Sequence, residues 1–526
     1  MKLDALKQGL LFGADRMLGD FLRSDDLCFT IQNEIAPQIQ LADFEDMYSE
    51  GGRPPVSPKV MVLILVLQYL ERLSDRAAAH NLRYRLDWKI ALGLELDFKG
   101  IHPTTLVYFR DRLLANNKAG YAFDRVIEHL VAVGLVKKSA KQRIDSTHII
   151  GNVRELSRLE LLHETLRLFS LDAIISRLTL GSGLLDTLKY YSEDISIRGI
   201  SDQQKAKYVR EAGLTMRVSI DWVTRLPEGT KLKTAASFKT LTQVYAQNFQ
   251  DDGTDPEGPK LIKIATGKDH ICSPHEVDAR YANKGGSGWL GYKAQVAETI
   301  PNAKGDVSFL TFIDVQEATQ HDSSATAAYV AYQGEKQTMP SEVYADTHYN
   351  SSANIEALAL DGIHLKGPVT PMPVKEAQEK NQGFELDIKR RKIICPEGQE
   401  TSRFTEWKDG RASGTFSKEA CQTCCSSDVC QPEKRGKRII IRPESDLLKQ
   451  RRALMETEEF KRDMHKRNGI EGTLSGLVRG NGMRRSRFRG KAKAELHIKL
   501  SGAAANISRL HRKRRLEASL ADKRVA

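Results

Sequence analysis

From Lys138 onward, short apolar runs rich in β-branched residues alternate with helical patterns, and this alternation constrains the fold more than any other feature. Runs of this length, bounded by turn residues, indicate strands. Strands that alternate with helices favour an α/β layer over an all-β sandwich. The pattern predicts strands at 143–149, 291–297, 307–315, 342–346 and 363–366, with helices at 322–333 and 351–358.

The predicted strands occupy one part of a longer chain. At 526 residues the chain is too long for one ordinary core, so several domains are expected. The α/β layer is expected within 138–375, interrupted by a long helical insertion at about 154–223. A charged segment that carries Gly and Cys follows at 376–440, and a long helix is expected within 441–480.

A helical N-terminal domain is predicted over 1–125. The Gly- and Pro-containing stretch at 51–55 breaks the helical pattern. Ser57 and Pro58 then supply the N-cap and the first-turn proline of a new helix. The all-apolar run that follows suits a helix buried within a small bundle.

Another helix is predicted to begin at His102-Pro103 and to face inward through Leu106, Phe109 and Leu113. Its neighbours Arg110 and Arg112 are expected to face outward. The arrangement is typical of a helix-turn-helix unit, whose last helix enters the major groove of DNA. The two arginines are therefore candidate DNA contacts, and the charged face of an ordinary helical bundle is the alternative.

The net charge of +12 is concentrated at the C-terminal end. The stretch from Arg479 to Ala526 holds fifteen Lys and Arg and three acids, which equals the surplus of the whole chain. Such a block attracts a polyanion, because each neutralised phosphate releases condensed counterions. A basic C-terminal tail is predicted over 481–526, either solvated or bound to nucleic acid. The candidate DNA contacts here are Arg479, Arg484, Arg485 and Arg487.

Targeting features are absent from the sequence. The first residues do not combine a basic start with a continuous apolar core, so they do not indicate a secretory signal. The apolar run at 60–67 is far shorter than the ~20 residues that cross a bilayer. We expect a soluble, cytoplasmic protein with no membrane partner.

Five of the seven cysteines lie between Cys395 and Cys430. In a cytosolic chain such a cluster indicates metal more than disulfides. Cys395, Cys421, Cys424 and Cys430 offer four thiolates, and the close pair Cys421-x-x-Cys424 fits tetrahedral zinc. Four ligands without an open position predict a structural Zn²⁺ that clamps a small β-ribbon. Cys425 in place of Cys424, or cysteines without a metal, are the alternatives.

Three acids are candidates for chemistry. Asp145 lies in the first predicted strand, where a buried carboxylate is costly unless it binds a cation or a donor. Asp346 ends a strand just before a helix, a position from which side chains converge on a ligand crevice. Glu471 lies on the late helix, one turn from Arg467. Since Mg²⁺ prefers a few carboxylates with water and phosphate oxygens, these acids are candidate ligands of Mg²⁺ or Mn²⁺.

A Gly-rich turn at 285–288 precedes the second strand and is surrounded by Arg280, Lys284 and Lys293. Backbone and cations at such a turn can approach a DNA phosphate. These three residues, with Arg467, are further candidate DNA contacts. The alternative is a β-turn with solvated charges.

The order of a strand Asp, a second strand Asp and a helix Glu resembles the RNase H-like domain of DDE transposases. The stretch from Gly51 through Arg110 resembles the InsH-type N-terminal domain of bacterial insertion-sequence elements. Other matching stretches are Asp145-Ser146-Thr147-His148, Ala345-Asp346 with Tyr349 and Ser351, and Arg467-Asn468-Gly469-Ile470-Glu471. The resemblance spans about residues 10 to 510.

This resemblance implies an RNase H-like mixed sheet with flanking helices, in which Asp145, Asp346 and Glu471 form the catalytic triad for two metal ions. It implies metal-dependent cleavage of DNA at the terminal inverted repeats and strand transfer into target DNA, by a homodimer on DNA associated with the bacterial nucleoid. Many relatives also carry Tyr and Lys on the last helix, where this chain has Met464 and Val478. The alternatives are an RNase H-like nuclease without strand transfer and an inactive, transposase-derived repressor that binds DNA.

Overall fold

The computed structural model divides the chain into two compact units. The first comprises Met1–Val343 and Arg467–Ala526, and the second comprises Tyr344–Lys466. The breaker predicted at 51–55 lies outside the described residues. The residues described are 22–48, 56–179, 181–193, 199–250, 258–262, 269–303, 305–370, 383–387, 389–407, 412–430, 432, 436–441 and 446–525.

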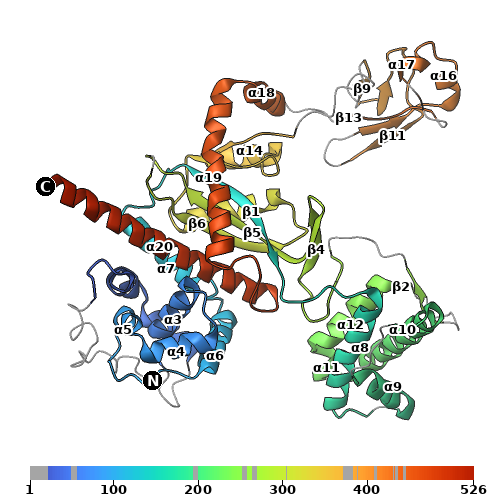
Figure 1. Cartoon of the computed structure of the whole chain (residues 1–526). Coiled ribbons are helices and arrows are strands. Elements are labelled where there is room, and N and C mark those ends of the chain that lie inside the picture. Colours follow the sequence, from blue (N-terminus) through green and yellow to red (C-terminus); the bar gives the residue numbers. More distant parts are fainter. Residues whose placement is uncertain are drawn as a thin grey trace. The chain divides into compact units, whose positions relative to one another are not determined.

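The first unit opens with a cluster of helices (Figure 1). The elements are α2 (Leu27–Thr30), η2 (Ile31–Ile35), η3 (Ala36–Gln38), η4 (Leu41–Met47), α3 (Pro58–Leu70), α4 (Asp75–Tyr84), α5 (Leu86–Leu92), α6 (Pro103–Ala115) and α7 (Tyr121–Ala132). Helix α3 begins at Pro58 as predicted and is buried on nearly all sides because its sequence is apolar all round. Ser74 caps α4 by accepting the Ala77 N–H, and the His102 side chain accepts the Thr104 N–H at the start of α6.

The mixed α/β part of this unit is built on one sheet. Its strands are β1 (Gln142–Ile150), β4 (Arg280–Lys284), β5 (Ser287–Thr299), β6 (Leu310–Glu317) and β7 (Glu342–Tyr344). The strands are ordered β4-β5-β1-β7, and β6 also pairs with β5. Strands β1 and β5 are antiparallel with Asp145 opposite Val296, and β5 and β6 are antiparallel with Ala294 opposite Val315. The strands predicted at 143–149, 291–297, 307–315 and 342–346 are thus confirmed, and the last of them ends at Tyr344.

Alternation along β1 sends successive side chains to opposite faces of the sheet. On one face, Gln142 donates a hydrogen bond to Gln333 of α13 (Ala325–Glu335), which follows η5 (Asp322–Ser324). On the other, Arg143 pairs with Glu298, whose carboxylate also accepts the Thr473 hydroxyl. Thr473 belongs to α19 (Glu458–Gly480), so the face that carries Asp145 is the one covered by this helix.

Most of the stretch predicted as a basic tail forms the helix α20 (Lys491–Val525), drawn as a red ribbon in Figure 1. Several of its apolar side chains up to Leu510 belong to the main core, among them Leu496, Ile498 and Ile507. A Cβ on Gly502 would lie 2.2 Å from Ile313 Cδ1, which shows how closely α20 approaches β6. The prediction of a tail was wrong because buried small and aliphatic residues share this helix with its basic residues.

The helical insertion has a hydrophobic core of its own, to which Leu162, Phe169 and Met216 contribute. The elements are α8 (Arg158–Ile175), α9 (Ser182–Ser192), α10 (Asp202–Thr224), α11 (Lys231–Thr234), α12 (Ala236–Asn248), β2 (Phe249–Gln250) and β3 (Lys260–Leu261). Capping boxes begin α8 and α10. The insertion therefore continues through α12, beyond the predicted end near 223.

The second unit contains a small antiparallel sheet in the order β11-β12-β13. Its elements are α14 (Ser352–Leu360), β8 (His364–Lys366), β9 (Glu385–Asp387), β10 (Lys392–Ile394), β11 (Arg403–Glu406), β12 (Ala412–Thr415), α16 (Lys418–Gln422), α17 (Ser427–Cys430), β13 (Arg438–Ile441) and α18 (Asp446–Met455). Ile393, Phe416 and Ile439 form its buried cluster, against which Cys395 and Cys421 pack. Across the described parts of both units, we find no helix with the length and apolar content that bilayer crossing demands.

Candidate active site

Asp145 lies in the middle of β1 with 12% of its side chain exposed. Its Oδ1 accepts the N–H of Ser146 at 2.7 Å. Its Oδ2 accepts a hydrogen bond from Nη2 of Arg467 at 2.8 Å. A carboxylate this buried requires such a partner, so the strand position predicted for Asp145 is one that a cation stabilises.

Glu471 lies on α19 one turn after Arg467, and 68% of its side chain is exposed. Its Oε1 is 3.6 Å from Nη1 of Arg467. The same guanidinium therefore faces two of the three predicted acids, Asp145 through one nitrogen and Glu471 through the other. The fold thus brings β1 and α19 together at these two carboxylates.

Arg467 has an incomplete set of hydrogen bonds. Its Nε is buried and has no hydrogen-bond partner among the described residues. A guanidinium carries five donors in a planar fork that matches carboxylate and phosphate oxygens. Arg467 neutralises the acid pair and retains a donor for another acceptor.

The charge of Arg467 leads to a prediction about metal affinity. On the prediction that Asp145 and Glu471 bind the metal, replacing Arg467 by Gln removes a cation that competes for the two carboxylates, a charge effect of about 1 kcal/mol at 4 Å in a water-like dielectric. We expect Mn²⁺ to bind Arg467→Gln about fivefold more tightly than it binds the parent chain, as measured by electron paramagnetic resonance of unbound Mn²⁺. Arg467→Lys, which keeps the charge, should stay within about twofold. Weaker binding by Arg467→Gln would show that this side chain builds the site instead of competing for it.

Asp346 belongs to the second unit and follows β7 directly. Its Oδ1 accepts the N–H of His348 at 2.9 Å, and its carbonyl accepts Nδ2 of Asn350 at 2.8 Å. These bonds turn the chain from β7 towards α14. Asp346 is half-buried at the end of a strand before a helix, as the sequence predicts.

A second acid in this unit was missed from the sequence. Asp463, on the first part of α19, accepts hydrogen bonds from the Tyr344 hydroxyl at 3.0 Å and from Lys366 Nζ at 3.0 Å, and it also pairs with Lys466. Burial acts to raise the pKa of Asp463, but the bonds from Lys466, Lys366 and Tyr344 outweigh it and lower the pKa to about 2. This cluster fixes the start of α19 to β7 and β8 within the unit.

Arg110 does not occupy the outward position predicted for it. It is 5% exposed, pairs with Asp75 at 2.6 Å, and lies over the ring of Phe488. Its guanidinium is therefore committed to the interior of the helical domain. Arg112 is exposed, with its guanidinium 4.8 Å from the ring centroid of Tyr48.

The basic residues near the Gly-rich turn differ in accessibility. Lys284 is exposed on the β4–β5 hairpin. Lys293 pairs with Asp322 at 3.0 Å, and Arg280 lies 3.5 Å from Glu317 with 11% of its side chain exposed. Lys284 is the most accessible of the three predicted contacts.

Two of the four predicted arginines before α20 donate hydrogen bonds to backbone carbonyls of the first unit. Arg484 donates to the carbonyl of His148 at 2.6 Å, and Arg487 donates to the carbonyl of Leu73 at 2.7 Å. Arg479 and Arg485 are exposed. The predicted contacts therefore divide into two that support the fold and two that face solvent.

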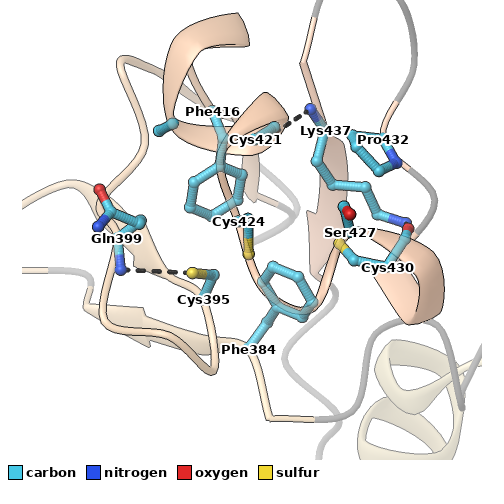
Figure 2. A pocket seen from close by; sticks show the side chains of 11 residues that line it. Phe384, Cys395, Gln399, Phe416, Cys421, Cys424, Ser427, Cys430, Pro432 and Lys437 are labelled. Atoms are coloured by element: carbon cyan, nitrogen blue, oxygen red, sulfur yellow. Dashed lines mark hydrogen bonds between the residues drawn. The ribbon is translucent and has the colours of Figure 1, made fainter.

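The predicted zinc ligands Cys395, Cys421, Cys424 and Cys430 line one pocket, shown in Figure 2. Cys395 Sγ accepts the N–H of Gln399 at 3.3 Å, and Cys421 Sγ accepts the N–H of Lys437 at 3.5 Å. Burial, followed by the neighbouring cysteines, raises the pKa of the Cys430 thiol, although Lys437 opposes this shift. Among the residues that the structure describes, no group of three or more His, Cys, Asp or Glu side chains is arranged to hold a metal ion.

Two transposase families match separate parts of the sequence. The family described as Transposase DDE domain matches residues 394–511, which include the four cysteines, Arg467 and Glu471. The family described as Transposase domain (DUF772) matches residues 16–112, which reach into α6. This N-terminal match is to a transposase domain, and its InsH-type assignment stays a prediction.

No curated protein matches the sequence. Among solved structures, a piggyBac transposase synaptic complex with hairpin DNA aligns with 94% of this chain and 76% of that chain, at 11% sequence identity and a TM-score of 0.28. At this identity and TM-score, we infer no property of this chain from that structure. The two family matches, at residues 16–112 and 394–511, support an insertion-sequence DDE transposase, an enzyme that acts on DNA.

Proposed function

We propose that this transposase cleaves DNA at the ends of its element and transfers the freed ends into target DNA, with Asp145, Asp346 and Glu471 as ligands of Mg²⁺ or Mn²⁺. The observation that carries the proposal is the guanidinium of Arg467. It contacts Asp145, which lies 322 positions away in the sequence, and also faces Glu471. Asp145 and Glu471, which are predicted to bind the same metal ions, are thus both close to the positive charge of Arg467.

The donor chemistry fits hard divalent cations, because carboxylates suit them better than imidazole or thiolate groups do. Two such ions, held by Asp145, Asp346 and Glu471, would supply activation of the attacking water or 3′-hydroxyl and stabilisation of the leaving oxygen. Arg467 exchanges Asp145 for a phosphate oxygen of the DNA, which its planar fork accommodates. This exchange both frees the Asp145 carboxylate and gives the buried Nε an acceptor.

The proposal extends to the fold. Three antiparallel strands (β1, β5 and β6), then a helix (α13), then β7 beside β1, follow the order expected of an RNase H-like sheet. The first acid lies in the middle of β1, and the last lies on a helix over the same face of the sheet. These placements support an RNase H-like catalytic domain.

Exposed basic residues are the proposed contacts with the DNA backbone. They are Arg112, Lys284, Arg479 and Arg485. A second group of basic residues already pairs with protein groups, and we propose that these residues make secondary contacts with the DNA. They are Arg280, Lys293, Arg484 and Arg487. Cleavage and joining of two element ends require two active sites, so we propose a homodimer on DNA.

The experiment that tests this proposal incubates the full chain with DNA carrying the element's ends, a target plasmid and Mg²⁺. We expect nicked ends and joined products, and a complex with the mass of a dimer by light scattering. Asp346→Asn should bind the same DNA without producing either. Nicks without joined products would indicate the nuclease, and binding without nicks in either protein would indicate the repressor.

A structural zinc ion is proposed for the Cys-rich segment, which we regard as a β-ribbon insertion. The four thiols share one pocket, and backbone N–H groups already point at two of the sulfurs. Zinc binding requires these side chains to close further around the ion. This closure would tie the small sheet to α16 and α17.

The zinc proposal predicts the metal content of the purified chain. We expect about one zinc per chain by mass spectrometry, because four thiolates complete a tetrahedral site. Cys421→Ser combined with Cys424→Ser should remove it. Cys425→Ser is the matched control, since Cys425 is exposed and does not line the pocket. An equal loss of zinc in the control, or no zinc in the parent chain, would contradict the site.

A further inference from the structure

The first unit contains a fully buried carboxylate that the proposed chemistry does not use. Glu298, near the end of β5, is 0% exposed and lies opposite Arg143 of β1. Arg143 donates to Glu298 Oε1 from Nε at 2.8 Å and from Nη2 at 2.6 Å. A buried charge is tolerated only with such partners, so the pair is a fixed point between the two strands.

The other oxygen of Glu298 connects the sheet to two helices. Its Oε2 accepts the Thr473 hydroxyl at 2.7 Å, Arg509 Nη1 at 2.9 Å and the Ser308 hydroxyl at 3.0 Å. Arg509 also donates to the Thr473 hydroxyl at 2.9 Å. One carboxylate thus fastens α19, through Thr473, and α20, through Arg509, to strand β5.

Helix α19 meets the same network at a second point. A Cβ on Gly469 would lie 2.0 Å from Nη1 of Arg143. This guanidinium cannot simply swing away, because it is held by Glu298 and only 10% of its side chain is exposed. Gly469 and Thr473 are four residues apart, so they lie on one face of the helix, and that face rests on the Arg143–Glu298 pair.

Of the two proposed metal ligands in the first unit, Asp145 lies next to this contact on β1, and Glu471 lies on the other side of α19. Asp145 follows Arg143 by two residues on the same face of β1. Glu471 lies between Gly469 and Thr473 in sequence and faces solvent. A shift or rotation of α19 against Arg143 would therefore move Glu471 relative to Asp145.

We propose that the buried network of Arg143, Glu298 and Arg509 sets the position of Glu471 relative to Asp145 by fixing α19 at Gly469 and Thr473. The inference rests on the proposed function, in which both acids bind the metal. Its members are positioning residues that touch neither metal nor DNA. Sequence reasoning missed them because the contacts join residues far apart in the chain.

The test compares two glycine substitutions on one helix. Gly469→Ala places a methyl group against Arg143, whereas a Cβ on Gly476 meets nothing within 4 Å. Both changes add the same helix propensity, so they differ in the contact alone. We expect Gly469→Ala to lose about 10- to 100-fold in Mn²⁺ affinity or in the rate of DNA cleavage, as supporting residues of metal sites do. Gly476→Ala should stay within about twofold of the parent.

A second pair of variants separates positioning from folding. Thr473→Ser keeps the hydroxyl that Glu298 accepts, and Thr473→Val removes it with little change of shape. We expect Thr473→Ser to retain Mn²⁺ affinity and Thr473→Val to lose it, while circular dichroism shows that both are folded. Equal Mn²⁺ affinity and equal cleavage in Gly469→Ala and Gly476→Ala would overturn the inference.

Asp145→Asn distinguishes this inference from the proposed function. If Asp145→Asn binds Mn²⁺ and cleaves DNA as the parent does, the proposed metal site itself is wrong. If Asp145→Asn loses both properties while Gly469→Ala matches Gly476→Ala, then the positioning network alone is wrong. Loss in Asp145→Asn and in Gly469→Ala, with Gly476→Ala unaffected, supports both.

Discussion

Asp145→Asn and Glu471→Gln are each expected to slow DNA cleavage and joining by about 10³-fold or more while leaving DNA binding intact. Each change removes one carboxylate charge from the proposed metal site. Losing about 4 kcal/mol of transition-state stabilisation corresponds to this factor, and metal coordination supplies several kcal/mol. The measurement is single-turnover cleavage of labelled end DNA in Mg²⁺, with a gel-shift assay of the same proteins.

The matched control for Glu471→Gln is Glu459→Gln. Glu459 is also exposed and lies on the same helix, twelve residues before Glu471 in the sequence, so its substitution makes the same chemical change at another turn of α19. We expect Glu459→Gln to cleave within about twofold of the parent chain. Cleavage by Glu471→Gln at the parent rate would remove Glu471 from the site.

The secondary structure around the three acids was predictable because the signals are local. A short apolar run with β-branched residues predicted the strand that contains Asp145, and a strand followed by a helix predicted Asp346 at a strand end. The helical pattern placed Glu471 and Arg467 one turn apart. What no local pattern contains is that Arg467 faces Asp145, a contact set by the path of the whole chain.

The basic surplus was a misleading guide to the C-terminal region. Charge density suggested a solvated tail, yet Ala503, Ala504, Ile507 and Leu510 are buried on α20. The apolar stripe of a helix is spread over every third or fourth residue, and the basic residues between them lower the average hydropathy. The basic residues therefore occupy only part of the surface of α20, and the buried apolar residues of the same helix pack it into the core.

The prediction that Arg110 and Arg112 of α6 both face outward conflicts with the geometry of a helix. Arg110 and Arg112 are two residues apart, which separates their side chains by about 200° around the helix axis. They cannot share one face, and Arg110 is the one that is buried against Asp75. Arg110 follows Leu106 by four residues and precedes Leu113 by three, so the apolar stripe itself places Arg110 on the inward face, where it pairs with Asp75.

The largest effect on stability is expected from Glu298→Ala. The change leaves the guanidinium groups of Arg143 and Arg509 without the carboxylate they share, with 10% and 21% of their side chains exposed. Removing one partner of a buried ion pair costs about 3–5 kcal/mol, because the remaining charge is left without compensation. We expect the urea unfolding midpoint of Glu298→Ala to fall accordingly, as followed by circular dichroism.

Two comparisons isolate the charge as the cause of this loss. Glu298→Gln keeps an oxygen that accepts the Thr473 and Ser308 hydroxyls but has no charge for the arginines, so its stability should lie between those of the parent and Glu298→Ala. Glu211→Ala removes an exposed helical ion pair with Lys207 and should change stability by less than about 0.5 kcal/mol. If Glu298→Ala proves as mild as Glu211→Ala, water or other groups must solvate the two arginines, and the buried pair would not anchor α19 and α20 to the sheet.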